Sequence, residues 1–345
     1  MPRPRLSEPL RRQALFWVNR LSFGDVARLL LERAGAALLS EDGLWRLAQA
    51  EAQARDAQQQ REVEETAALP EPGYVAPTDL YAAGAGEFVV LTDGIGVKAQ
   101  RPTRTRQRPT RTRQRPTRTR AHGPGESQGS RSEKKPGERR HDTDVLILPR
   151  RGGGEQVLCE GVSGGWTLVE AARAFLRREW GGASLAVVAI TNGAPAIRGD
   201  LAALFGGGVR VVLDWYHLAK RVYEHLSMAA HSRSEREAWE QRVLSLLWRG
   251  QASAARQWLA GVAPRNAGAL AALIGYLDKH QPEIIDYGRR QQAGLPIGSG
   301  RMEKCVDQVV GRRQKGKGMS WTKSGSRALA LLRVAELNAL QPLPA

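Results

Sequence analysis

Residues 184–197 read SLAVVAITNGAPAI, and this stretch decides how the rest of the sequence is interpreted. Its apolar run LAVVAI, rich in β-branched side chains, predicts a buried strand over 184–191. Strand ends of this kind often carry catalytic carboxylates, yet the next residue, Asn192, offers an amide. As a turn residue before Gly193, Asn192 is ordinary. Its meaning therefore depends on what surrounds the strand.

The segments around this strand alternate as expected for a mixed sheet flanked by helices. Strands are predicted over 87–97, 144–149, 155–162, 184–191 and 209–215, and helices over 167–180 and within 195–208. The first strand, EFVVLTDGIGV, is expected to be broken at Asp93-Gly94. Three consecutive strands followed by alternating helices and strands predict an α/β fold with an RNase H-like mixed sheet.

The remaining segments divide the chain around this core. Near the N-terminus, one helix is expected to end at Gly35 and the next to begin after Ser40, an arrangement compatible with a helix-turn-helix or with an ordinary helical pair. The predicted organisation is a helical region over 1–66, possibly a DNA-binding one, a Pro- and Gly-rich linker over 67–86, the first part of the core over 87–215, a helical insertion over 216–290, and the last part of the core over 291–345.

Length and composition exclude several classes of protein. The 345 residues are 41% apolar, enough to bury a sizeable core. No stretch approaches the ~20 apolar residues of a membrane span, and the first residues lack the apolar core of a secretion signal. The two cysteines, Cys159 and Cys305, have no metal-ligand spacing and indicate a reduced, cytoplasmic setting.

The net charge of +17 indicates a polyanionic partner, but the charge is unevenly distributed. Between Lys98 and Arg140, fifteen Lys or Arg face only three Glu. Within this segment the unit RPTRTRQ occurs at 101–107 and 108–114, and a third copy at 115–121 ends in Ala. A proline in each copy and the absence of apolar residues predict a disordered or extended insert over 98–140 rather than a helix.

The repeated arginines are candidate phosphate contacts. Each copy supplies one central arginine, namely Arg104, Arg111 and Arg118. Such a segment gives salt-sensitive affinity for nucleic acid without sequence preference. The alternative is that the repeat arose by slippage in the gene and is merely tolerated in a surface loop.

Three polar residues follow predicted strands or open a helix, as a phosphoryl-transfer site requires. Asp93 follows FVVLT, Asn192 follows LAVVAI, and Glu303 follows the turn PIGSG. Two-metal sites hold their ions ~3.5–4 Å apart with carboxylates from separate elements, and Mg²⁺ prefers such oxygen ligands.

On these motifs the sequence resembles the DDE transposases of bacterial insertion sequences, in the branch related to Mutator elements. The matching motifs are TDG at 92–94, NGAP at 192–195 where the family has Asp-Gly-Ala, LDWYHL at 213–218, and PIGSGRMEK at 296–304. The resemblance runs from about residue 10 to the C-terminus, apart from the arginine-rich insert, and a helical insertion before the glutamate is another shared feature.

The resemblance implies a role for each residue. Asp93 matches the first catalytic aspartate, Asn192 stands at the position of the second, and Glu303 matches the glutamate; together they would bind Mg²⁺ or Mn²⁺. Asp214 and His217 match an Asp-x-x-His signature on the fifth strand and are accessory candidates. Asp93 could instead belong to a hairpin turn, Glu303 could complement a helix dipole, and Asp214 could either support the site or replace the missing carboxylate.

The segment GRRQKGKGMSW at 311–321 is a second nucleic-acid candidate. It offers Arg312, Arg313, Lys315, Lys317 and Trp321 for phosphate contacts and base stacking. A solvated surface loop is the alternative.

These features together predict a transposase that acts in DNA transposition and DNA recombination of a mobile element. It would bind the element ends and target DNA as a homo-oligomer associated with the nucleoid, and cleave and transfer strands with a bound metal. Because an amide lacks the charge of a carboxylate, catalysis is expected to be impaired. The alternatives are a non-catalytic DNA-binding relic or regulator and, with less support, an RNA-binding protein.

Overall fold

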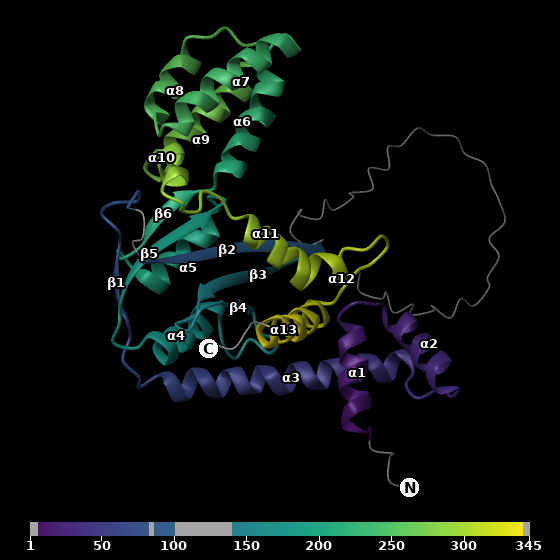
Figure 1. Ribbon diagram of the computed structural model, residues 1–345. Helices are drawn as coiled ribbons and strands as arrows, with labels where there is room; N and C mark the ends of the chain where they lie inside the picture. Colours follow the sequence, from purple (N-terminus) through teal and green to yellow (C-terminus); the bar gives the residue numbers. More distant parts are fainter. Residues whose placement is uncertain (1–5, 83–85, 101–139, 341–345) are drawn as a thin grey trace, which may run out of the picture.

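The computed structural model describes residues 6–82, 86–100 and 140–340, and shows a mixed α/β fold with mostly helical content around an open mixed sheet (Figure 1). The strands are β1 (Gly73–Val75), β2 (Glu87–Lys98), β3 (Arg140–Pro149), β4 (Glu155–Cys159), β5 (Ser184–Thr191) and β6 (Arg210–Leu213). Strands β4, β3 and β2 pair antiparallel, and β2 pairs parallel with β5. Strands β1 and β6 both pair parallel with the other edge of β5.

Both faces of the sheet are buried, which explains the unbroken apolar run of β5. Val187 and Ala189 face one side, where α4 (Leu168–Trp180) and α5 (Pro195–Phe205) pack. Val188 and Ile190 face the other side, toward α11 (Gly300–Val306) and α13 (Lys323–Ala339). A central strand covered on both sides has no polar face, and so its side chains do not alternate in polarity.

The predicted helix ends in the N-terminal region are confirmed. The helices there are α1 (Glu8–Val18), α2 (Phe23–Ala34) and α3 (Glu41–Thr66). Gly35 ends α2 with a φ of 68°, and the Ser40 hydroxyl accepts a hydrogen bond from the Gly43 backbone N–H at the start of α3. With 26 residues, α3 is far longer than a helix of a helix-turn-helix, and it packs along α13 (Figure 1).

The predicted insertion is helical throughout the described residues. It contains α6 (Trp215–Ala229), α7 (Arg233–Trp248), α8 (Ala252–Ala260), α9 (Ala267–His280) and α10 (Tyr287–Gln292). These helices project together from one end of the sheet (Figure 1). In the part of the chain that the structure describes, no helix combines the length and apolar character needed to cross a membrane.

The structure corrects the predicted break in the first strand and the predicted bounds of the insert. Strand β2 runs without a break through Asp93-Gly94, because β3 pairs with it from Leu91 to Lys98 and this pairing outweighs the local turn preference. The insert is also shorter than predicted, since Lys98 and Arg140 are paired strand residues. Residues 101–139, and with them the predicted disorder, lie outside the described residues.

Candidate active site

Parallel pairing of β2 and β5 brings Asp93 and Asn192 together. Leu91 pairs with Ile190, so the residues two positions later on each segment lie side by side. The Asn192 side-chain N–H donates a hydrogen bond of 2.9 Å to Asp93 Oδ1. The structure thus brings these two predicted site residues into contact, and Asp93 lies within β2 rather than at the end of a strand.

The turn after β5 fixes the orientation of the Asn192 amide. Its Oδ1 accepts a hydrogen bond of 2.9 Å from the Ala194 backbone N–H. A flipped amide would place its N–H against that N–H and its oxygen against the Asp93 carboxylate, so the two contacts select one orientation. Gly193 has a φ of 79°, and a side chain there would collide with His280.

Asp214 lies beside His217, and both of its carboxylate oxygens accept hydrogen bonds. One carboxylate oxygen of Asp214 caps α6 by accepting a hydrogen bond of 2.9 Å from the His217 backbone N–H. Its second oxygen accepts from the Ser299 hydroxyl at 2.5 Å and from the Ser299 backbone N–H. Burial alone would raise its pKa, but the hydrogen bonds from His217 and Ser299 outweigh burial and lower the pKa of Asp214 to about 2.

This arrangement favours the support role of Asp214 over direct replacement of the carboxylate that Asn192 lacks. The side chain is only 1% exposed, and both of its oxygens are engaged by protein donors. The predicted strand 209–215 ends at Leu213, so Asp214 caps α6 and His217 lies in the first turn of that helix rather than on a strand.

His217 lies between two carboxylates. Its Nδ1 is 3.4 Å from Asp214 Oδ1 and its Nε2 is 3.8 Å from Glu303 Oε1. Both separations exceed those of well-formed hydrogen bonds, so the attraction is mainly one of charges. Asp214 is the main cause of the raised pKa of His217, with further contributions from Glu303 and Asp93.

Glu303 faces this cluster from α11, and its side chain is 60% exposed. Its charge and that of Asp214 add to burial, the largest cause, in raising the pKa of Asp93. Asp307, one turn later, is bonded instead to Arg312 at 2.8 Å. The helix continues from α11 through a π-helical turn, Asp307–Gly311, into α12 (Arg312–Gln314); such turns are frequent at functional sites.

The donor set does not fit a metal site built on Asp93, Asn192 and Glu303. Asn192 presents its nitrogen to Asp93, and its only side-chain oxygen is bonded to Ala194. Within residues 6–82, 86–100 and 140–340, no three Asp, Glu, His or Cys side chains are placed to hold one ion.

The basic loop divides into buried and exposed cations. Arg313 is only 5% exposed and donates to the Val18 carbonyl, and burial lowers its pKa to about 10. Trp321 donates its indole N–H to the Gln314 carbonyl. Arg313 is thus buried and Trp321 is partly buried against the core, whereas Arg312, Lys315 and Lys317 are exposed cations.

The exposed cations adjoin the end of the paired strands β2 and β3, where Lys98 pairs with Arg140. The Trp321 backbone N–H donates a hydrogen bond of 2.9 Å to the Lys98 carbonyl, which connects the loop to β2. A hollow of about 370 Å³ lies between them and is lined by Lys98, Arg140 and Lys315. Arg104, Arg111 and Arg118 belong to the insert and lie outside the described residues.

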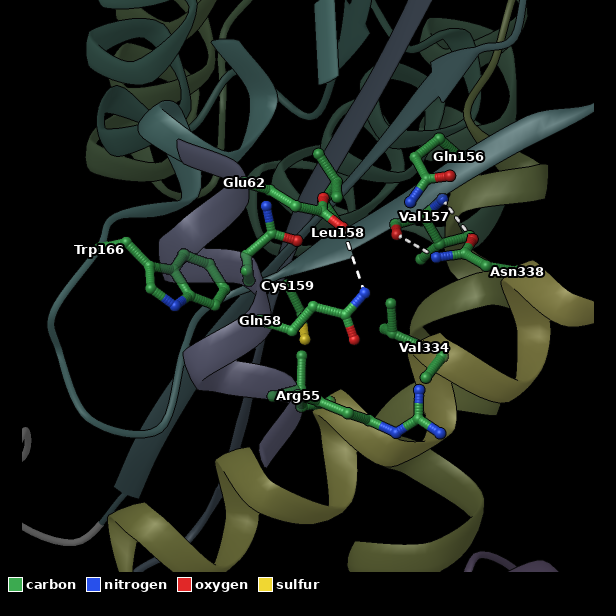
Figure 2. A pocket seen from close by; sticks show the side chains of 13 residues that line it. Arg55, Gln58, Glu62, Gln156, Val157, Leu158, Cys159, Trp166, Val334 and Asn338 are labelled. Atoms are coloured by element: carbon green, nitrogen blue, oxygen red, sulfur yellow. Dashed lines mark hydrogen bonds between the residues drawn. The ribbon is translucent and has the colours of Figure 1, made fainter. Parts of the chain in front are cut away.

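A second cavity, of about 130 Å³, lies between α3, β4 and α13 and contains none of the candidate catalytic residues (Figure 2). On its rim, the Asn338 amide both donates to and accepts from the backbone of Val157 at 2.9 Å. This side chain thereby satisfies the edge strand β4, as a neighbouring strand would. We assign the cavity to packing between helices and sheet edge.

No family model matches the chain. A search of curated proteins also finds no match.

Two sets of residues beside the site are not evident from the sequence. Ser299, within the motif PIGSG, binds Asp214 from 85 positions away. Arg198, His280 and Glu283 form a network behind Gly193, with contacts of 2.6–2.9 Å. No local pattern reveals either set, because their partners come from distant segments.

The raised pKa of His217 predicts a pH-dependent stability. A histidine whose pKa is raised by folding above its ordinary 6.5 stabilises the folded protein. This stabilisation is complete below pH 6.5 and is lost as the pH rises through the higher pKa of the folded state. We expect the urea midpoint of the wild type, in EDTA, to fall slightly more between roughly pH 6 and 9 than that of His217→Gln. His231→Gln, at an exposed histidine outside the cluster, is the control. If the urea midpoints of wild type and His217→Gln changed equally with pH, the contact between His217 and Asp214 would not stabilise the protein.

Proposed function

We propose that this protein is a DNA-binding protein of the DDE transposase type whose phosphoryl-transfer site is weakened by Asn192. The observation that carries the proposal is the meeting of Asp93, Asn192 and Glu303 from three elements around His217. A strand order of β4-β3-β2-β5-β6, three antiparallel strands followed by two parallel ones, supports an RNase H-like core.

The chemistry of the proposed site depends on charge. Transposases of this type hold Mg²⁺ or Mn²⁺ between three carboxylates, and the metals stabilise the attacking and leaving oxygens. Here Asp93 and Glu303 supply two carboxylates, and the Asn192 amide is neutral and turned with its nitrogen toward Asp93. The residues present do not fit that metal pair, so DNA binding without efficient cleavage, as in a relic or regulator, is the form of the proposal that the geometry favours.

The same proposal names the partners and the place of action. The partners are the DNA ends of a mobile element and target DNA, bound by a homo-oligomer on the bacterial nucleoid. The net charge of +17 and the exposed cations of the basic loop support a polyanionic partner.

Salt-dependent binding of duplex DNA tests this proposal. We expect fluorescence anisotropy to show an affinity that falls steeply with salt, and Lys315→Ala/Lys317→Ala to lower the slope of log K against log salt by up to about 2, because each lost phosphate contact removes about 0.9. Lys279→Ala, at an exposed lysine of α9, is the control. Absence of salt-dependent binding by the wild type would overturn the proposal, and equal effects of all these variants would remove the loop from it.

A further inference from the structure

Two exposed tyrosines mark one face of α6. Tyr216 is 61% exposed and Tyr223 is 46% exposed. They are seven residues apart, so they lie on the same face of the helix and about 10 Å apart along its axis. Lys220 and Ser227 share this exposed stripe, and Glu224 at its edge pairs with Arg221 at 3.4 Å. The stripe thus combines aromatic and cationic groups.

Each tyrosine ring contacts one protein group and still remains exposed to solvent. The Tyr216 ring packs against Gly298, where a Cβ atom would lie only 2.6 Å from Tyr216 Cδ2. The guanidinium of Arg236 lies 4.8 Å from the centre of the Tyr223 ring. A ring fixed in this way loses little entropy on binding and presents a π-face for stacking.

The stripe leads into a basic hollow at the end of α6. The hollow has a volume of about 360 Å³ and lies where α6, the start of α7 and the segment before α9 meet. It is lined by Tyr223, Ser227, His231, Arg233, Arg236 and Arg265, with no acidic residue in its lining. Glu237 bonds Arg233 and Arg236 at 2.8 and 2.9 Å and so orients them. Guanidinium and hydroxyl groups placed together can donate hydrogen bonds to phosphate oxygens.

We propose that this face of α6 and the hollow bind an unpaired DNA strand, with bases stacked on Tyr216 and Tyr223 and phosphates on Lys220, Arg236 and Arg265. The inference rests on the proposed function, which makes DNA the partner. Bases in a duplex are stacked inside the helix and cannot reach two separate rings, whereas single-strand sites combine aromatic platforms with cations in this way. Because Tyr216 adjoins His217, the strand passes directly beside the candidate active site.

A single-stranded oligonucleotide containing 2-aminopurine tests the proposal, because stacking quenches the fluorescence of that base. We expect the full chain to bind and quench it. Tyr216→Ala and Tyr223→Ala should each weaken binding about tenfold and reduce the quenching, and Tyr223→Phe should retain both. Arg265→Ala should weaken binding but keep the quenching at saturation. Met228→Ala, exposed on α6 outside the stripe, is the control and should match the wild type.

The same variants are measured with duplex DNA, which separates this inference from the proposed function. We expect Tyr216→Ala and Tyr223→Ala to bind duplex as the wild type does. If both alanine variants bound and quenched the single strand as the wild type does, the strand site would be overturned. It would also be overturned if they lost duplex binding to the same extent as single-strand binding. Normal duplex binding would then leave the proposed function standing, whereas a wild type that binds neither DNA would overturn both.

Discussion

Arg290→Met is expected to lower the free energy of unfolding by about 3–5 kcal/mol, because it leaves the Glu87 carboxylate buried without its partner. Arg290 is 0% exposed and bonds both carboxylate oxygens of Glu87, at 2.9 and 2.6 Å. It also donates to the carbonyls of Leu80 and Pro296, at 2.8 Å each. Arg290, in α10, thus connects the start of β2 to the segment that leads into α11. These two elements carry Asp93 and Glu303.

Chemical denaturation of matched variants checks this prediction. Arg256→Met breaks an ion pair with Asp278 in which both side chains are more than 40% exposed, and should cost less than about 1 kcal/mol. Adding Glu87→Gln to Arg290→Met should recover part of the loss, since the unpaired charge is removed. If Arg290→Met and Arg256→Met were equally stable, the buried pair would not hold these segments together.

Asn192→Asp is expected to make stability depend on Mg²⁺. The substitution replaces a hydrogen bond to Asp93 by a second carboxylate beside it. Without metal, we therefore expect the free energy of unfolding to fall by about 1–3 kcal/mol and the pKa of Asp93 to rise further. A cation bound only by the folded state stabilises it by mass action, so Mg²⁺ should reverse much of that loss.

Thermal unfolding with and without Mg²⁺ measures this effect. Asn192→Ala is the matched control, because it removes the hydrogen bond without adding charge and should gain nothing from Mg²⁺. Equal Mg²⁺-induced shifts of the melting temperature in wild type and Asn192→Asp would show that the amide does not limit metal binding.

The parts of the fold that were predictable from sequence are those set by local patterns. Strand β5 matches the predicted 184–191 because its apolar run is bounded by polar and turn residues. The helix over 167–180 was expected with Thr167 at its start, and Thr167 and Glu170 form a capping box there.

The parts that were not predictable depend on distant partners. Asp93-Gly94 has the sequence of a turn, but pairing with β3 keeps it in a strand. Arg313 resembles its exposed neighbours in sequence, and only the packing of α1 and α2 against the loop buries it. The contact of Asp214 with Ser299 crosses the whole helical insertion.

Cleavage of DNA that carries the sequences flanking this gene, in Mg²⁺, tests the central claim most directly. We predict little cleavage by the wild type and a gain of more than about 100-fold in Asn192→Asp, since even outer partners of metal ligands are worth roughly 10- to 100-fold. Adding Asp93→Asn to Asn192→Asp should abolish the gain. Substantial cleavage by the wild type that is lost in Asp214→Ala would contradict the account, because Asp214 would then supply the missing carboxylate.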